Sequence, residues 1–306
     1  MSRSQDPREP LHRPEFIETR ELTTPLSDLE SRSPEEKPAR ASNSETQIQP
    51  RHPSRLARPR QIQEIRGRTY RVRDSEVKAM VELGKFRAIA QEDLIEFFYA
   101  GDKGRFRPDM ENLVRQGLLE IKAIPHEAQG SRTLFTLTKQ GHRFLTQTQA
   151  AAKNQVLYHG FAMPREAHHD ADLYRLYQKA AEEIERIGGR NLRVVLDFEI
   201  KKRVYHDLAK LGKDRDSPWH KREIAERHSL KMVRSKIPVP DIRIEYETRD
   251  GEKARIDLEL ATGHYRGQNL AEKISAGFAL FARADDAVKL RKVLHQRKLT
   301  AEILSL

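Results

Sequence analysis

The sequence has no cysteine and only one tryptophan, Trp219, among 306 residues. The absence of cysteine excludes disulfides, thiolate nucleophiles and cysteine-based zinc sites, and it is typical of a cytoplasmic protein. No apolar run approaches the roughly 18 residues that a membrane-spanning helix needs. The first residues also lack the apolar core of a signal peptide. We therefore expect a cytoplasmic protein that does not act in a membrane.

Hydrophobic residues are scarce, and positive charge is in excess. The chain is 37% hydrophobic and 34% charged, which is low in apolar content for one compact globule and predicts a long solvated segment. The formal net charge of +11 favours a polyanionic partner, either nucleic acid or an acidic membrane surface. The sequence has no P-loop, no dinucleotide-binding fingerprint and no nucleophile elbow, which argues against those nucleotide-binding and hydrolase classes.

Composition divides the chain into four segments. Residues 1–65 hold nine of the 15 prolines and no apolar periodicity, which predicts a disordered tail. A winged-helix domain is expected over 66–150, a linker over 151–165 and an α/β domain over 166–306. An arginine-rich stretch leads into the winged-helix segment, and it is either an arm that lies along DNA or a soluble tether. Its arginines are Arg51, Arg55, Arg58, Arg60, Arg66, Arg68, Arg71 and Arg73.

Residues 74–148 begin with three predicted helices. Apolar residues recur at helical spacing over Val77–Gly84 and again over Leu94–Phe98. Asp74 is the expected N-cap of the first helix. Pro108 stands where a first-turn proline is tolerated, so a short third helix is expected over Pro108–Gln116.

A hairpin and a fourth helix follow. Strand-like runs cover 118–124 and 133–138, and Gly130 marks the tip between them. Thr138 then caps the last helix. The order helix, helix, helix, hairpin, helix is that of a winged helix-turn-helix, whose third helix enters the major groove of DNA.

The third helix and the hairpin carry the side chains that we predict to bind DNA. Arginine, asparagine and glutamine can make bidentate hydrogen bonds to base edges. The candidates on and before the third helix are Lys103, Arg105, Arg107, Asn112, Arg115 and Gln116. The candidates on the hairpin, suited to phosphates, are Lys122, His126 and Arg132. The alternative is a small structural or protein-binding domain with an ordinary solvated basic face.

The segment 166–306 alternates helical and strand patterns, which predicts an α/β unit. The predicted elements are a helix over 173–187, a strand over 192–198, a hairpin over 241–261, a helix over 269–283 and a strand or helix over 288–306. Trp219 is expected to fill a core. Asp170 is expected to cap a helix beside the solvated imidazoles of His168 and His169.

Carboxylates gather on one face of the predicted hairpin. Period-two alternation places Asp257 and Glu259 on one face of a strand, and Asp241 begins the antiparallel neighbour. Mg²⁺ prefers oxygen ligands and usually takes one or two carboxylates, so these residues are a candidate magnesium site that would activate water. Glu199 would add a further acid. Lys273, on the next helix, would supply a cation near the developing charge.

At these positions the sequence resembles a known family. Pro240-Asp241 followed by Asp257-Leu258-Glu259 is similar to the PD-(D/E)XK nuclease core. More closely, residues 70 to about 285 resemble the replication-relaxation proteins of plasmids and conjugative elements, which combine a winged helix with a diverged core of this type. The matching motifs are His169-Asp170, Asp197-Phe198-Glu199, Val239-Pro240-Asp241, Asp257-Leu258-Glu259 with Thr262, and Lys273.

One position departs from the pattern of an active nuclease. Glu259 stands where the family pattern has a lysine that orients water, and Lys273 on the following helix is the candidate substitute. Two interpretations therefore stay open. The acids and Lys273 form a working Mg²⁺ site, or the sheet is catalytically inactive and serves docking or dimerisation.

The sequence thus predicts an α+β protein with a disordered tail, a winged helix-turn-helix and an α/β restriction-endonuclease-like domain. The resemblance implies a DNA-binding protein of the mobile-element replication-relaxation type. Double-stranded DNA is its expected partner, with other relaxation or replication proteins beside it. The nuclease-like domain would then serve regulation or assembly. The alternatives are a Mg²⁺-dependent DNA nickase or endonuclease and a protein-binding scaffold.

Overall fold

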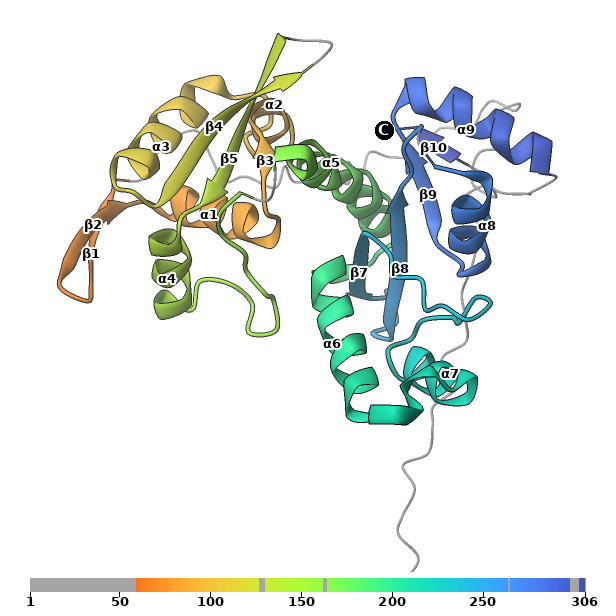
Figure 1. Cartoon of the computed structure of the whole chain (residues 1–306). Helices are drawn as coiled ribbons and strands as arrows, with labels where there is room; N and C mark the ends of the chain where they lie inside the picture. The colour runs from red at the N-terminus through yellow and green to blue at the C-terminus, as the bar shows by residue number, and fades with distance from the viewer. Residues whose placement is uncertain (1–58, 127–129, 162–163, 264, 298–302, 306) are drawn as a thin grey trace, which may run out of the picture. The chain divides into compact units, whose positions relative to one another are not determined.

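Figure 1 shows the chain as a succession of helices and strands, which makes it a mixed α/β protein. The computed structural model describes residues 59–126, 130–161, 164–263, 265–297 and 303–305. The predicted tail, apart from its last residues, lies outside these ranges, and so do residues 127–129 beside the predicted hairpin tip Gly130. The described residues belong to one compact unit.

The first described element is a hairpin that the sequence analysis did not predict. Strand β1 (Gln61–Ile65) pairs antiparallel with β2 (Arg68–Val72). Arg66 and Gly67 form the turn, both with positive φ, as tight two-residue hairpin loops require. The first strand therefore lies within residues 1–65, where the composition predicts a disordered tail.

Three helical segments follow this hairpin. They are α1 (Asp74–Lys85), α2 (Gln91–Asp93) with its π-helical continuation η2 (Leu94–Phe98), and α3 (Lys103–Arg115). The short strand β3 (Ile89–Ala90) lies between the first two. The α1 helix begins one residue earlier than predicted, because Arg73 rather than Asp74 occupies the N-cap position.

The third helix starts earlier than its sequence indicated. Asp102 is the N-cap, and its Oδ1 accepts a hydrogen bond from the backbone N–H of Arg105 at 3.0 Å. Pro108 therefore lies inside the helix rather than in its first turn. The cap determines the start, because it satisfies an amide that would otherwise lack a partner.

The predicted wing is a two-stranded hairpin completed by β3. Strand β4 (Leu119–His126) pairs with β5 (Gly130–Leu137), and β3 pairs with the other edge of β5. Helix α4 (Lys139–Thr148) follows, and Thr138 caps it as predicted by accepting from the N–H of Gly141 at 3.0 Å.

Residues 151–161 form no helix or strand, as expected of a connector. The connector nevertheless packs against its surroundings. The N–H of Tyr158 donates to the carbonyl of Gly84 at 2.6 Å, and Gln155 bonds the backbone of Val194. The long helix α5 (Pro164–Arg186) comes next.

The rest of the chain is built on a mixed sheet. Its order among the described residues is β10 (Ile303–Ser305), β9 (Ala279–Ala282), β8 (Lys253–Leu260), β7 (Ile242–Glu247) and β6 (Arg190–Leu196). Strands β6, β7 and β8 are antiparallel neighbours, whereas β9 runs parallel to β8 and β10 parallel to β9.

Helices connect these strands. Helix α6 (Asp197–Lys210), the 3-10 turn η3 (Gly212–Asp216) and α7 (Pro218–Arg227) separate β6 from β7. Helix α8 (Gly267–Ser275) precedes β9, and α9 (Ala284–Arg297) follows it. The predicted helix over 269–283 was too long, because Gly277 adopts a positive φ and the chain continues as β9.

One apolar core contains residues from elements along most of the described chain. One buried cluster includes Met80 of α1, Tyr174 of α5 and Leu258 of β8, and the rings of Phe86 and Tyr174 meet edge to face at 5.2 Å. Trp219, expected to fill a core, is instead 67% exposed. Within the described ranges, none of the helices combines the length and apolar character that crossing a membrane requires.

Candidate nucleic-acid interface and acidic cluster

Helix α3 displays a stripe of charged side chains to solvent. Lys103, Arg107, Glu111 and Arg115 follow one another at a spacing of four residues, and all four are exposed. None of the three cations forms an ion pair with another described residue. The four residues border a groove whose apolar lining includes Ile95, Phe106, Met110, Val114 and Ile121. Arg105 is half-buried beside this stripe.

Two of the predicted base-reading residues serve the fold instead. Asn112 is buried, and its Nδ2 donates to the carbonyl of Arg71 at 3.0 Å and to Glu76 at 3.1 Å. Gln116 accepts from the N–H of Arg71 and donates to its carbonyl, at 2.8 and 2.9 Å. Both side chains therefore fasten β2 to α3, and their amides are occupied within the protein.

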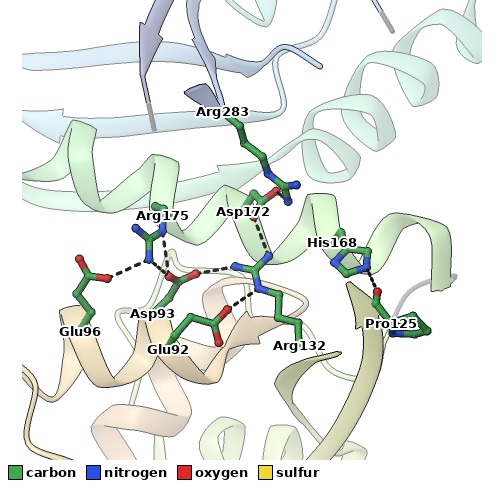
Figure 2. A network of polar contacts seen from close by, with 9 residues as sticks. All are labelled: Glu92, Asp93, Glu96, Pro125, Arg132, His168, Asp172, Arg175 and Arg283. Atoms are coloured by element: carbon green, nitrogen blue, oxygen red, sulfur yellow. Dashed lines mark hydrogen bonds and ion pairs between the residues drawn. The ribbon is translucent and has the colours of Figure 1, made fainter. Parts of the chain in front are cut away.

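Lys122 and Arg132, the two predicted phosphate contacts of the β4–β5 hairpin with described side chains, have different surroundings. Lys122 is exposed, with its Nζ 5.7 Å from the ring centre of Phe161. Arg132 is buried and donates to Glu92, Asp93 and Asp172 at 2.7, 3.1 and 2.8 Å. Figure 2 shows this guanidinium enclosed by the three carboxylates, so it is not placed to contact a phosphate.

Arg132 belongs to a larger network of polar contacts (Figure 2). Asp93, which is fully buried, also forms an ion pair with Arg175. Arg175 in turn pairs with Glu96 at 2.9 Å. Arg283 pairs with Asp172 from the other side. Burial raises the pKa of Asp93, and the two arginines oppose that shift. The network joins α2 and β5 to α5.

Asp241 and Glu259 of the predicted metal site lie close together. The pairing of Ile242 with Leu258 in the antiparallel β7–β8 ladder places these two acids opposite each other on one face. Asp241 Oδ2 accepts the N–H of Leu260 at 2.9 Å. Lys273 Nζ lies 2.6 Å from Glu259 Oε1 and donates to the carbonyl of Val239 at 2.9 Å.

Glu259 is an unusually buried acid. Its side chain is 1% exposed, Tyr265 donates to Oε1 at 2.6 Å, and Oε2 has no hydrogen-bond partner among the described residues. Burial and the charge of Asp241 raise the pKa of Glu259 to about 7, although Lys273 opposes the shift. The proton affinity of this carboxyl therefore lies well above that of an ordinary glutamate.

Asp257 and Glu199 have arginine partners of their own. Arg243 grips Asp257 with two hydrogen bonds of 2.6 and 2.9 Å and also donates to the carbonyls of His228 and Ser229. Glu199 forms ion pairs with Arg193, at 2.5 Å, and with Arg203. The structure thus brings together Asp241, Glu259 and Lys273, and assigns Asp257 and Glu199 to separate ion pairs.

Three residues beside Asp241 were not among the predicted site residues. His169 Nε2 lies 3.6 Å from Asp241 Oδ1, the N–H of Asp197 donates to the carbonyl of Asp241, and Lys201 pairs with Asp197 at 2.6 Å. Burial lowers the pKa of His169, but Asp241 and neighbouring acids outweigh it and raise the value. The signal was present in the sequence, because His169 and Asp197 belong to motifs of the resemblance.

The neighbouring acid Asp170 is not the helix cap that the sequence predicted. It lies inside α5 and is buried, and burial raises the pKa of its carboxyl to about 6. Its Oδ2 has no hydrogen-bond partner among the described residues.

The donor set does not fit the predicted magnesium site. Among the described residues, no three or more histidine, aspartate or glutamate side chains are grouped so that they would hold a metal ion. The Lys273 ammonium lies 2.6 Å from Glu259 Oε1, so it occupies the position beside this carboxylate that a bound Mg²⁺ would need. We therefore derive no metal-dependent step from this cluster.

Comparison of the chain with family models, with curated proteins and with solved structures gave no match.

Proposed function

We propose that this chain binds duplex DNA through α3. The observation that carries the proposal is the exposed stripe in which Lys103, Arg107 and Arg115 have no ion-pair partner among the described residues. Unpaired arginines on a helix face can bind phosphates or make bidentate hydrogen bonds to guanine. Glu111, within the same stripe, can accept a hydrogen bond from cytosine. The stripe therefore offers both affinity and base selection.

The surrounding elements support the proposal. The order α1, β3, α2, α3, β4, β5 and the sheet order β3-β5-β4 are those expected of a winged helix-turn-helix with α3 as its recognition helix. Lys122 on β4 is the wing residue best placed to meet the DNA backbone. Arg60 also lies beside α3, where its guanidinium donates to the carbonyl of Pro108 at 2.9 Å, but it pairs with the buried Glu76 at 2.7 Å and is not counted among the DNA contacts.

The part after residue 164 would contribute regulation or assembly in a protein of the replication-relaxation type. The resemblance that suggests this role rests on short motifs. Four of them meet at one point, since Asp241 contacts His169 and Asp197 and lies opposite Glu259. This convergence is what a shared core would produce, and it supports the resemblance without requiring cleavage.

An anisotropy titration with labelled duplex DNA tests the proposal. We expect Arg107→Ala and Arg115→Ala each to weaken binding about 5- to 150-fold, which is the size of one bidentate base contact. For each phosphate contact removed, the slope of log affinity against log salt should fall by about 0.9.

Arg143→Ala is the matched control. Arg143 is an exposed arginine on α4, outside the stripe, and its loss should leave the affinity within about twofold of the wild-type value. Equal losses in all three variants would show non-specific attraction by net charge. The absence of any duplex binding at low salt would refute the proposal.

A further inference from the structure

The single tryptophan stands on the surface of α7. Pro218 and Trp219 are its first two residues, and Trp219 is 67% exposed. The imidazole of His220 contacts the indole with ring centres 4.9 Å apart and planes at 77°. A proline at the first helical position fixes the local backbone. The indole is therefore presented to solvent from a constrained position.

The region around Trp219 carries an excess of positive charge. Residues 200–236, which span most of α6, η3 and α7, contain twelve lysines and arginines and five aspartates and glutamates. That surplus of seven positive charges is most of the +11 of the whole chain. A polyanion is thus the partner whose charge complements this region.

Several of these cations are not used within the protein. Arg222 follows Trp219 by three residues on the same side of α7, and it is exposed without an ion pair to any described residue. Lys202 on α6 and Lys213 on η3 are likewise exposed and lack such a partner. Tyr205, 61% exposed on α6, adds a second surface aromatic.

The elements are held together by an apolar core of their own. Val204 and Leu208 of α6 pack with Ile224 and Ala225 of α7, while Trp219 stays outside this cluster. Figure 1 shows α7 beside the end of α6. The exposed aromatic and the cations therefore lie on one ordered support.

We propose that Trp219 and Arg222 of α7, with the exposed cations Lys213 of η3 and Lys202 of α6, form a surface that binds single-stranded nucleic acid. An exposed indole can stack on an unpaired base, and nearby cations can follow the phosphates, which is how non-specific single-strand binding works. Bases in a duplex are already stacked on each other, so their faces do not reach Trp219. The single-strand site is separate from α3 and does not depend on duplex binding there.

Intrinsic fluorescence provides a direct test, because Trp219 is the sole tryptophan of the full chain. Stacking of a base on an indole quenches its emission. Titration with a thymidine oligonucleotide at low salt should quench the emission in a saturable manner, and the same oligonucleotide annealed to its complement should quench much less. Arg222→Ala, which keeps the fluorophore, should weaken the quenching curve. It should also lower the salt slope by about 0.7 for the lost phosphate contact.

Anisotropy of a labelled single strand extends the test to the stacking residue itself. Trp219→Ala should weaken single-strand affinity about 5- to 150-fold, as expected for one base–aromatic stack. Ile62→Ala is the matched control, since Ile62 is also a large apolar residue with 69% exposure, and its loss should have no effect. Arg107→Ala should leave the quenching curve unchanged, so failure at α3 and failure at this surface are distinguishable.

Three results would overturn the proposal. The first is no quenching by the single strand at low salt, and the second is equal quenching by the duplex. The third is an unchanged single-strand affinity in Trp219→Ala. A blue shift of the emission that grows with protein concentration, without any effect of nucleic acid, would instead assign the surface to contact between copies of the chain.

Discussion

Nη1 of Arg132 donates to Oδ1 of Asp172 at 2.8 Å, and the two side chains are only 7% and 10% exposed. This contact joins β5 to α5. Because Arg132 also holds Glu92 and Asp93, its positive charge is fully engaged by three carboxylates. An arginine that the sequence offers as a phosphate contact is therefore part of the internal structure.

Removing this guanidinium should destabilise the protein strongly. Arg132→Ala leaves the buried Asp93 and Asp172 each short of a partner, and breaking a buried ion pair costs about 3–5 kcal/mol. Arg283→Ala removes the 45% exposed partner of the same Asp172 and should cost less than about 1 kcal/mol. Urea unfolding of both variants measures the difference. Equal costs would contradict the central role of Arg132.

Asn112 and Arg107 lie five residues apart on α3, and alanine substitutions at the two positions should affect the stability of the protein differently. Asn112→Ala removes hydrogen bonds to Arg71 and to the buried Glu76, so we expect a loss of about 1–3 kcal/mol in the free energy of unfolding. Arg107→Ala should change that free energy by less than about 0.5 kcal/mol, because the side chain is exposed. Stability that falls in both variants would mean that Arg107 also supports the fold.

The stability of the protein should depend on pH through Glu259. The ordinary pKa of its carboxyl is 4.5, and burial raises it to about 7 in the fold. Folding therefore favours the protonated form. This contribution is complete below pH 4.5 and is lost as the pH rises to about 7.

Glu259→Gln cannot ionise, so its stability should fall less between pH 4.5 and 7.5 than that of the wild type. The pKa values of Asp170 and His169 are also raised, so the stability of Glu259→Gln should still fall somewhat as the pH rises. Urea midpoints measured across this range check the expectation. Exposed Glu120→Gln is the control and should follow the wild-type curve. A Glu259→Gln curve parallel to the wild type would rule out this source of pH dependence.

Supercoiled plasmid incubated with the protein and Mg²⁺ should stay intact. Asp257 is ion-paired with Arg243, and Glu259 with Lys273, so the predicted acids do not form a set of oxygen ligands open to Mg²⁺. Gel analysis of the plasmid measures nicking. Nicking that Asp241→Asn abolishes and that exposed Asp250→Asn leaves intact would show that the cluster does cleave DNA.

The order of elements over 74–148 could be predicted because periodicity and turn residues are local signals. Thr138 capped its helix as predicted, and the two predicted strands paired as β4 and β5, although Gly130 is the first residue of β5 rather than the tip between them. The start of α3 could not be predicted from Pro108, because the Asp102 cap outweighed the local preference of proline. The β1–β2 hairpin was missed because the proline-rich composition before it masked its alternation.

The sequence by itself determined the mixed α/β class, the basic third helix and the cross-strand placement of Asp241 and Glu259, because these follow from spacing along the chain. Only the tertiary structure decided which charges are available. Arg132 and Asn112 have the same side-chain chemistry as a DNA contact, but partners distant in sequence bury them, whereas Trp219 lacks such partners and remains exposed. Burial depends on neighbours from other segments, and no local pattern contains that information.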